Sequence, residues 1–217
     1  MHSQKIIVLS DFNGTISLTN IAERILRLFA DEKWVYYDNL CLDGKISLDE
    51  AIIAEYSLLH APKESILEEI DKIYQIRPHF IDLVNFLAQS EIEFIIITTG
   101  LDFVIQHLLS NLGISNNIKI VSTTAIYKDD NSLEVTGPMR FDTSIIDFKL
   151  DHVLHYKKEG FTVVYIGDSY SDFQAVLGAD QIFSIRESKL SAYCIKHKLH
   201  FEEFEDFQEV IDVIKTK

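Results

Sequence analysis

Polar side chains suited to phosphoryl chemistry follow three apolar runs of the sequence. Asp11 follows the first run, in the stretch VLSDFNGTIS. The second run ends in Thr98–Gly100, and the third ends in Gly167–Asp168, with Asp172 four residues later. Taken singly, these residues are typical of ordinary turns and helix caps. Since ligands of open α/β sheets bind outside the carboxyl ends of the strands, we expect the three segments to form one site.

An aspartate in such a place can attack phosphorus. The Asp11 carboxylate would act as the nucleophile and form an aspartyl phosphate, which divides hydrolysis into two easier steps. Because its charge repels a phosphate dianion, the site also needs a hard cation, and Mg²⁺ binds one or two carboxylates while keeping some waters. We expect Asp11 and Asp168 to hold the Mg²⁺, and Asp172 to orient a coordinated water.

A phosphoryl group also needs donors for its equatorial oxygens. The hydroxyl of Thr98 and the ammonium of Lys149 would supply them and neutralise charge in the transition state. Backbone amides around Phe12 and Thr99 could add further donors. Lys149 by itself is typical of a surface lysine, so its assignment depends on the rest of the pattern. Together these residues predict a site for one phosphoryl group.

Composition limits the partners of the protein. The chain has 217 residues, of which 47% are hydrophobic and 25% charged, as in one globular domain with or without an insertion. A net charge of −14 argues against a nucleic-acid partner, which would need clustered Lys and Arg. No apolar run approaches the roughly 20 residues that span a bilayer, and MHSQKIIVLS lacks the order of a secretory signal. We therefore expect a cytoplasmic protein with no membrane contact, whose oligomeric state the sequence does not determine.

The spacing of apolar residues predicts the elements that position the site. KIIVLS, FIIIT and FTVVYIG are short runs rich in Ile and Val, typical of buried parallel strands. Helical spacing follows between and after them, at about 101–112, 144–158, 170–177, 188–197 and 205–215. Alternating strands and helices of this kind predict a doubly wound, mostly parallel α/β sheet.

Two segments interrupt that alternation. Residues 18–88 carry four helical patterns, TNIAERILRLFA, SLDEAIIAEYSLL, KESILEEIDKIY and HFIDLVNFLAQ, with Ser47 marking one helix start. We interpret 18–88 as a helical cap inserted into a core of residues 1–17 and 89–217, with its last helix returning toward the core. The segment VSTTAIYKDDNSLEVTGPMRF predicts a β-hairpin that turns near Asp129–Asn131.

The motifs DFNGT, IIITTG, Lys149 and GDSYSD resemble the four motifs of the haloacid dehalogenase superfamily, in the same order and at suitable spacing. With the strand pattern they cover the whole core. The helical insertion after the first motif is similar to the small cap of the phosphoserine phosphatase-like branch. The resemblance implies a Rossmann-type core, Mg²⁺ at the carboxyl edge of the sheet, and a cap that closes over a small phosphorylated metabolite. It therefore implies a phosphomonoester hydrolase.

One position departs from that pattern. The family has Asp two residues after the nucleophile, where this chain has Asn13. In the family this Asp protonates the leaving alkoxide and activates water, while its backbone carbonyl binds the metal. Asn13 keeps the carbonyl but cannot transfer the proton, and losing such a group costs about 10²- to 10⁴-fold in rate. Three explanations stay open: an engineered substitution, an enzyme whose substrate has a good leaving group, or a phosphate-ligand binding or regulatory protein with little turnover.

Substrate specificity is expected to lie in the cap. In phosphoserine phosphatases an acidic residue near the cap recognises the substrate's amino group. The resemblance implies that the matching position is Asn20, with Glu23 one turn later, which argues against phosphoserine. Arg77 could contact a substrate anion from the junction of cap and core, although Pro78 favours a simple role at a helix start.

Overall fold

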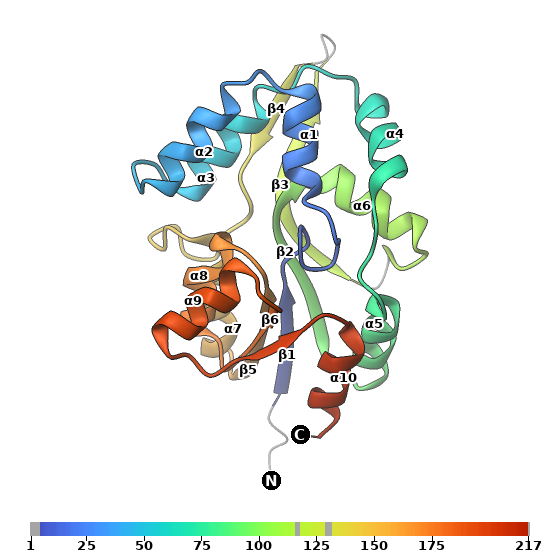
Figure 1. Ribbon diagram of the computed structural model, residues 1–217, viewed down its shortest axis with the longest axis vertical. Helices are drawn as coiled ribbons and strands as arrows, with labels where there is room; N and C mark the ends of the chain where they lie inside the picture. The colour runs from blue at the N-terminus through green and yellow to red at the C-terminus, as the bar shows by residue number, and fades with distance from the viewer. Residues whose placement is uncertain (1–4, 116–117, 129–131, 217) are drawn as a thin grey trace.

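A seven-stranded sheet forms the centre of the protein in a computed structural model that describes residues 5–115, 118–128 and 132–216 (Figure 1). The strand order is β4-β3-β2-β1-β5-β6-β7, and every pair is parallel except β3–β4. The strands are β1 (Lys5–Ser10), β2 (Glu93–Leu101), β3 (Lys119–Tyr127), β4 (Leu133–Thr136), β5 (Phe161–Gly167), β6 (Gln181–Ile185) and β7 (Glu202–Phe204). The predicted mostly parallel α/β fold is confirmed.

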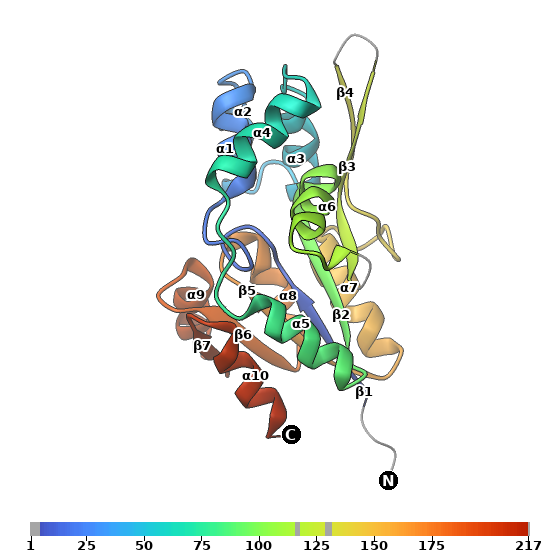
Figure 2. The ribbon, with the colours of Figure 1, turned by 90° about the vertical axis from the view of Figure 1, so that its right-hand side faces the viewer.

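Helices cover both faces of the sheet because its central strands are apolar on both sides. In β1, Ile7 and Leu9 belong to one buried cluster and Val8 to the other, as the two-residue period of a strand requires. The Val8 side packs under α5 (Phe80–Gln89), α6 (Asp102–Asn111) and α10 (Phe207–Lys215). The opposite side packs under α7 (Phe148–Lys158), α8 (Phe173–Gly178) and α9 (Lys189–His197) (Figure 2).

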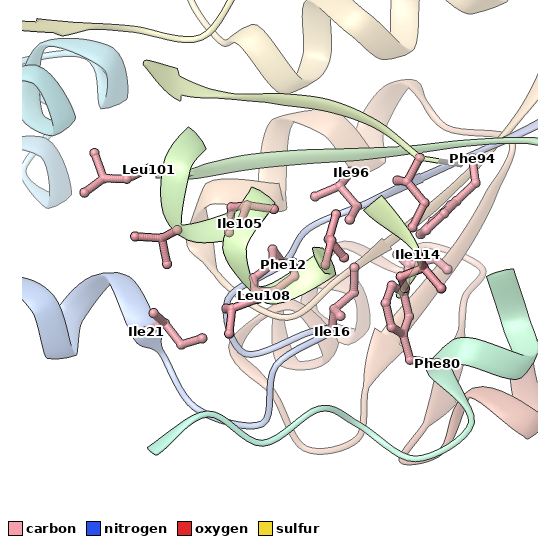
Figure 3. Close-up of a cluster of buried hydrophobic side chains, with 14 of the residues drawn as sticks. Phe12, Ile16, Ile21, Phe80, Phe94, Ile96, Leu101, Ile105, Leu108 and Ile114 are labelled. Carbon is pink, nitrogen blue, oxygen red and sulfur yellow. The ribbon is translucent and has the colours of Figure 1, made fainter. Parts of the chain in front are cut away.

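The loop after β1 is fixed by its own apolar side chains. Phe12 and Ile16 are fully buried. They lie in the cluster that also contains Ile96 of β2 and Leu108 of α6 (Figure 3). Because Phe12 and Ile16 anchor the loop from below, the polar residues between and beside them are held at the sheet edge.

Four helices lie beyond the carboxyl edge of the sheet (Figures 1 and 2). They are α1 (Ile21–Phe29), α2 (Trp34–Leu42), α3 (Leu48–Tyr56) and α4 (Lys63–Ile73). Ser47 caps α3 and forms a capping box with Glu50, as the sequence pattern predicts. By contrast, α5 packs against α10 and β2. The division of the chain into a cap of residues 18–88 and a core stays a prediction.

The predicted hairpin is formed by β3 and β4, which pair antiparallel from Thr124–Thr136 to Tyr127–Leu133. Its predicted turn, Asp129–Asn131, lies outside the described residues. Within the described ranges, every helix is too short or too polar to cross a membrane.

Candidate active site

Two neighbouring strands, and the short helix that follows one of them, bring the predicted carboxylates together. Asp11 follows β1, and Asp168 follows β5, which is the direct neighbour of β1. Asp172 ends the short 3-10 helix η2 (Tyr170–Asp172). One carboxylate oxygen from each of the three residues lies within 4.8 Å of those of the other two. The structure therefore groups at one edge the acids that the sequence separates by more than 150 positions.

Asp11 is held from two sides. Its Oδ1 accepts a hydrogen bond from the backbone N–H of Phe12 at 2.6 Å, and its Oδ2 lies 2.9 Å from Nζ of Lys149. Only 4% of Asp11 is exposed. Burial raises the pKa of the Asp11 carboxyl and Asp172 adds to the rise, while the Lys149 ammonium opposes it. The side chain is thus pre-oriented, with its charge only partly balanced.

Lys149 lies behind Asp11 in the first turn of α7, which Asp147 caps. Its fully buried ammonium donates to Asp172 Oδ1 at 2.7 Å and to Ser171 Oγ at 3.1 Å, besides pairing with Asp11. Burial lowers the pKa of Lys149, but the two carboxylates outweigh burial, so the pKa is raised overall. Lys149 therefore stays charged and links Asp11 of the DFNGT motif to Asp172 of the GDSYSD motif.

Asp172 accepts four hydrogen bonds. Oδ1 accepts from Lys149 and from the hydroxyl of Tyr165 at 2.7 Å, and Oδ2 accepts from the N–H groups of Asp168 and Ser169 at 3.0 Å each. Since a carboxylate offers about four acceptor positions, those of Asp172 are filled. The residue orients Lys149 and the Asp168 backbone, and has no free lone pair to offer an ion.

The Asp168 side chain contacts the loop after β1. Its Oδ1 accepts from the Thr15 hydroxyl at 2.7 Å. Gly14 has φ +80, and a Cβ at Gly14 would stand 2.5 Å from Asp168 Oδ2, so glycine is required on both conformational and steric grounds. Burial raises the pKa of Asp168, and the neighbouring Asp172 and Asp11 raise it further.

The cluster suits a hard divalent cation. Asp11 and Asp168 offer it carboxylate oxygens, the ligand type that Mg²⁺ prefers, while Asp172 adds negative charge beside them. Lys149 supplies one positive charge against the three carboxylates. When all three are ionised, two negative charges remain, which a divalent cation would neutralise. The raised pKa values of Asp11 and Asp168 have the same origin, because crowded buried carboxylates resist ionisation until a cation joins them.

Asn13 occupies the position where the family motif has an acid. Its Oδ1 accepts from the Ala22 N–H at 3.3 Å, which fixes the orientation of the amide, because a flipped amide would place two donors together. The Nδ2 group is buried and has no hydrogen-bond acceptor among the described residues. It lies beside the end of β2, where a Cβ on Gly100 would be 3.2 Å away. Asn13 thus presents an unused donor next to Asp11.

The two threonines of the second motif differ in their surroundings. Thr98 is fully buried, and its Oγ1 accepts from the Gly100 N–H at 3.1 Å. Thr99 lines a cavity above the sheet edge. Thr99 therefore lies in the cavity wall. Thr98 is outside the cavity lining, and its hydroxyl holds the backbone at Gly100.

That cavity has a volume of about 710 Å³ and lies between the carboxyl edge of the sheet and helices α1–α3. Asp11, Asn13 and Asp168 line it from the core, and Asn20 lines it from the start of α1. Asn20 is the N-cap of α1, and its side chain accepts from the Glu23 N–H at 3.1 Å. A space of this size accommodates a small metabolite.

Arg77 lies outside the lining of this cavity. Its guanidinium donates to three backbone carbonyls, those of Thr15 at 2.7 Å, Gly14 at 2.9 Å and Glu205 at 3.0 Å. Nearby, the Arg77 N–H donates to Ile16 O at 2.8 Å, which joins the two chain segments that lead into and out of the helical insertion. Arg77 thus links the loop after β1 to the segment after β7.

We expect Arg77→Gln to lower the free energy of unfolding by about 2–4 kcal/mol, because three backbone carbonyls lose the charged donor that the buried Arg77 supplies. Urea titration measures the loss. Arg24→Gln is the matched control, since Arg24 is exposed and its pair with Glu69 contributes at most about 1 kcal/mol. Equal losses in the two variants would contradict the anchoring role of Arg77.

Several polar residues of the site are missing from the sequence-based prediction. Tyr165 was read as part of an apolar strand, although a tyrosine in a fully buried run must satisfy its hydroxyl, and here it does so on Asp172. Thr15 is part of the first motif but was given no role. Asp38 and Tyr170, which are hydrogen-bonded at 3.0 Å, meet only because the helical insertion folds over the core.

Comparisons with known proteins agree with this geometry. The family model for haloacid dehalogenase-like hydrolases matches residues 8–176. The chain is 28% identical to the bifunctional enzyme MtnB/MtnX of Bacillus licheniformis, covering 98% of this chain and 50% of that protein. It is 24% identical to polyol phosphate phosphatase PYP1 of Saccharomyces cerevisiae, covering 97% and 93% of the two chains.

A third relative is the 2-hydroxy-3-keto-5-methylthiopentenyl-1-phosphate phosphatase of Exiguobacterium sibiricum, 25% identical over 96% of each chain. Among solved structures, a phospho-aspartyl intermediate analogue of phosphoserine phosphatase superposes with a TM-score of 0.70, at 18% identity, over 97% of this chain and 99% of that one. Motifs, fold and family model agree: the chain belongs to the haloacid dehalogenase-like hydrolases, and its fold is like that of phosphoserine phosphatase.

Proposed function

We propose that the protein is a Mg²⁺-dependent phosphomonoester hydrolase that acts on a small phosphorylated metabolite through an aspartyl phosphate formed on Asp11. The observation that supports this most is the Asp11 carboxylate at the floor of a closed-in cavity, oriented by the Phe12 N–H and Lys149 and adjacent to Asp168. Attack by Oδ of Asp11 on phosphorus would break the bond to the leaving oxygen, and water would then release phosphate from Asp11.

In this proposal Asp11 and Asp168 hold the metal ion, together with the backbone carbonyl of Asn13. When bound, Mg²⁺ supplies positive charge against the phosphoryl oxygens and the attacking carboxylate. Asp172 keeps Lys149 and the Asp168 backbone in place through its four hydrogen bonds. Lys149 and the backbone amides near Thr99 balance charge on the phosphoryl group.

Asn13 determines how fast the first step is. Its free Nδ2–H can donate a hydrogen bond to the leaving oxygen but cannot give it a proton. We therefore propose slow turnover of esters with basic leaving groups, and faster turnover of esters whose leaving group departs as a stable anion. The names of the relatives, a polyol phosphate phosphatase and a methylthiopentenyl phosphate phosphatase, support a small phosphorylated metabolite as substrate.

Asn13 also favours a second candidate function. A chain that keeps the metal and phosphate residues but lacks the proton donor could bind a phosphorylated ligand with little turnover and act as a regulatory protein. The two candidates differ in one observable, since only the hydrolase releases phosphate catalytically.

Phosphate release from p-nitrophenyl phosphate and a panel of small phosphate monoesters tests the proposal. We expect release over many turnovers with Mg²⁺, and a fall of about 100-fold or more with EDTA, because the ion supplies several kcal/mol of charge stabilisation. Adding Mg²⁺ back should restore the rate. Release that persists in EDTA would contradict the metal-dependent mechanism. Tight binding of a panel member without turnover would favour the regulatory candidate.

A further inference from the structure

The cavity divides into a phosphoryl end and a leaving-group end. Asp11, Asn13 and Asp168 form the first, and the facing wall is formed by α1–α3 of the helical insertion and by Tyr170. The unused Asn13 Nδ2 donor, on a side chain more than nine-tenths buried, indicates that an oxygen of a ligand is accepted at this place. A phosphate ester seated over Asp11 must therefore direct its leaving group toward the insertion.

Besides Asp11 and Asp168, four carboxyl groups line the cavity: those of Glu23, Asp38, Glu55 and Glu187. Glu23 is paired with Arg27 and Glu187 is exposed, which leaves Asp38 of α2 and Glu55 of α3, two helices that pack against each other. Asp38 accepts the Tyr170 hydroxyl at 3.0 Å, which leaves it with spare acceptor positions. In the described part of the chain, the side-chain carboxyl of Glu55 has no hydrogen bond or ion pair, although the residue is partly buried.

Within the described ranges, the cations that line the cavity form no ion pair with Asp38 or Glu55. Among the described residues that line the cavity, Arg27 and Lys189 carry positive charge. Arg27 pairs with Glu23 at 2.7 Å. Lys189 is exposed and lies with its Nζ 5.7 Å from the centroid of the Tyr170 ring. The leaving-group end therefore holds two carboxyl groups without a cation of their own.

Burying the Glu55 carboxyl beside Asp38 without a cation costs free energy on folding, and a cationic ligand would recover that cost. Burial, with a smaller contribution from the charge of Asp38, raises the pKa of the Glu55 carboxyl to about 8. Apolar side chains, including Trp34 and Ile52, line the same wall and keep the local dielectric low. Burying a carboxyl without a partner is costly, and a cation brought in by the ligand would remove that cost.

We infer that the leaving group of the substrate carries a positively charged amine, held between Glu55 and Asp38, and that it carries no second anionic group. The inference rests on the proposed function, because it places the phosphoryl group over Asp11. A carboxylate or second phosphate at this end would meet Glu55 and Asp38 with like charge, whereas a neutral hydroxyl would gain hydrogen bonds but no charge attraction.

Three phosphate esters with a two-carbon leaving group test the inference: phosphoethanolamine, 2-hydroxyethyl phosphate and carboxymethyl phosphate. They differ in the terminal group, which is cationic, neutral or anionic. We expect kcat/KM to be about 10- to 100-fold higher for phosphoethanolamine than for the hydroxyethyl ester, and lowest for the carboxymethyl ester. Equal values for the first two esters, or a preference for the anion, would overturn the inference.

Glu55→Gln should remove most of the preference for phosphoethanolamine and change hydrolysis of the hydroxyethyl ester by less than about threefold. Glu68→Gln is the matched control, because Glu68 is an exposed carboxyl of α4 outside the cavity lining, and its ester preference should equal that of the wild type. Retention of the full preference in Glu55→Gln would contradict the role of this residue.

Failure of this inference is distinguishable from failure of the proposed function. Hydrolysis of p-nitrophenyl phosphate reports the phosphoryl chemistry alone, so activity on it without any amine preference refutes the inference and leaves the hydrolase proposal standing. Binding of the three esters to Asp11→Asn protein, measured by calorimetry, reports recognition without turnover. We expect the same order of affinity there, and loss of that order would overturn the inference even if no ester were hydrolysed.

Discussion

Replacing Asp11 with Asn is expected to abolish phosphate release, with a loss on the order of 10⁴-fold or more. The amide has nearly the same shape and can still meet the Phe12 N–H and Lys149, but it is a poor nucleophile and a weak metal ligand. Phosphate release from p-nitrophenyl phosphate at saturating Mg²⁺ measures the loss. Acid quenching of wild-type protein during turnover should trap phosphate on Asp11, and the variant should trap none.

Asp82→Asn provides the control for this substitution. Asp82 is an exposed residue in the first turn of α5, and its change from acid to amide should leave the rate within about twofold. If Asp11→Asn kept more than about a tenth of the wild-type rate, the nucleophile would have to be another group or a water molecule. The cluster of three carboxylates would then serve metal binding alone.

Replacing Asn13 with Asp is expected to raise the rate by about 10²- to 10⁴-fold for an alkyl phosphate, equivalent to roughly 3–5 kcal/mol of barrier. The new carboxyl would keep the contact with the Ala22 N–H and gain the ability to protonate the leaving oxygen. For p-nitrophenyl phosphate the gain in the first step should be smaller, because p-nitrophenolate leaves without protonation. Steady-state kinetics on both esters measure the two gains.

Asn20→Asp separates proton transfer from simple charge. Asn20 lines the same cavity, so its substitution adds the same negative charge without placing an acid beside Asp11. We expect Asn20→Asp to leave both rates within a fewfold of the wild type. An equal gain in the two variants would point to electrostatics, and no gain on either ester in Asn13→Asp would refute the proposed role of position 13.

The fold class and the family could be predicted from the sequence because their signals are local. Buried runs such as that of β5 are read directly from the apolar pattern, and the motif residues follow those runs at once. The grouping of Asp11, Asp168 and Asp172 needs only the rule that parallel strands share an edge. The roles assigned to these residues stay predictions.

Other parts depend on tertiary contacts that the sequence pattern does not reveal. Helix α2 is absent from the predicted helices because it has no side-chain N-cap and buries only Trp34, so it shows little periodicity. Strand β7 has two acids among its three residues and becomes a strand by pairing with β6. Glu55 faces the cavity because α3 packs across the sheet edge, which no local signal indicates.

The position of the strands that carry Asp11 and Asp168 has a consequence for motion. Strands β1 and β5 are each hydrogen-bonded to a neighbour on both sides, so the carboxylates that follow them are supported by the centre of the sheet. The insertion contributes the opposite wall through short helices, one of which buries a single side chain. In the proposed reaction, movement of that wall would let an ester enter and its alcohol leave while the carboxylates of Asp11 and Asp168 keep their positions.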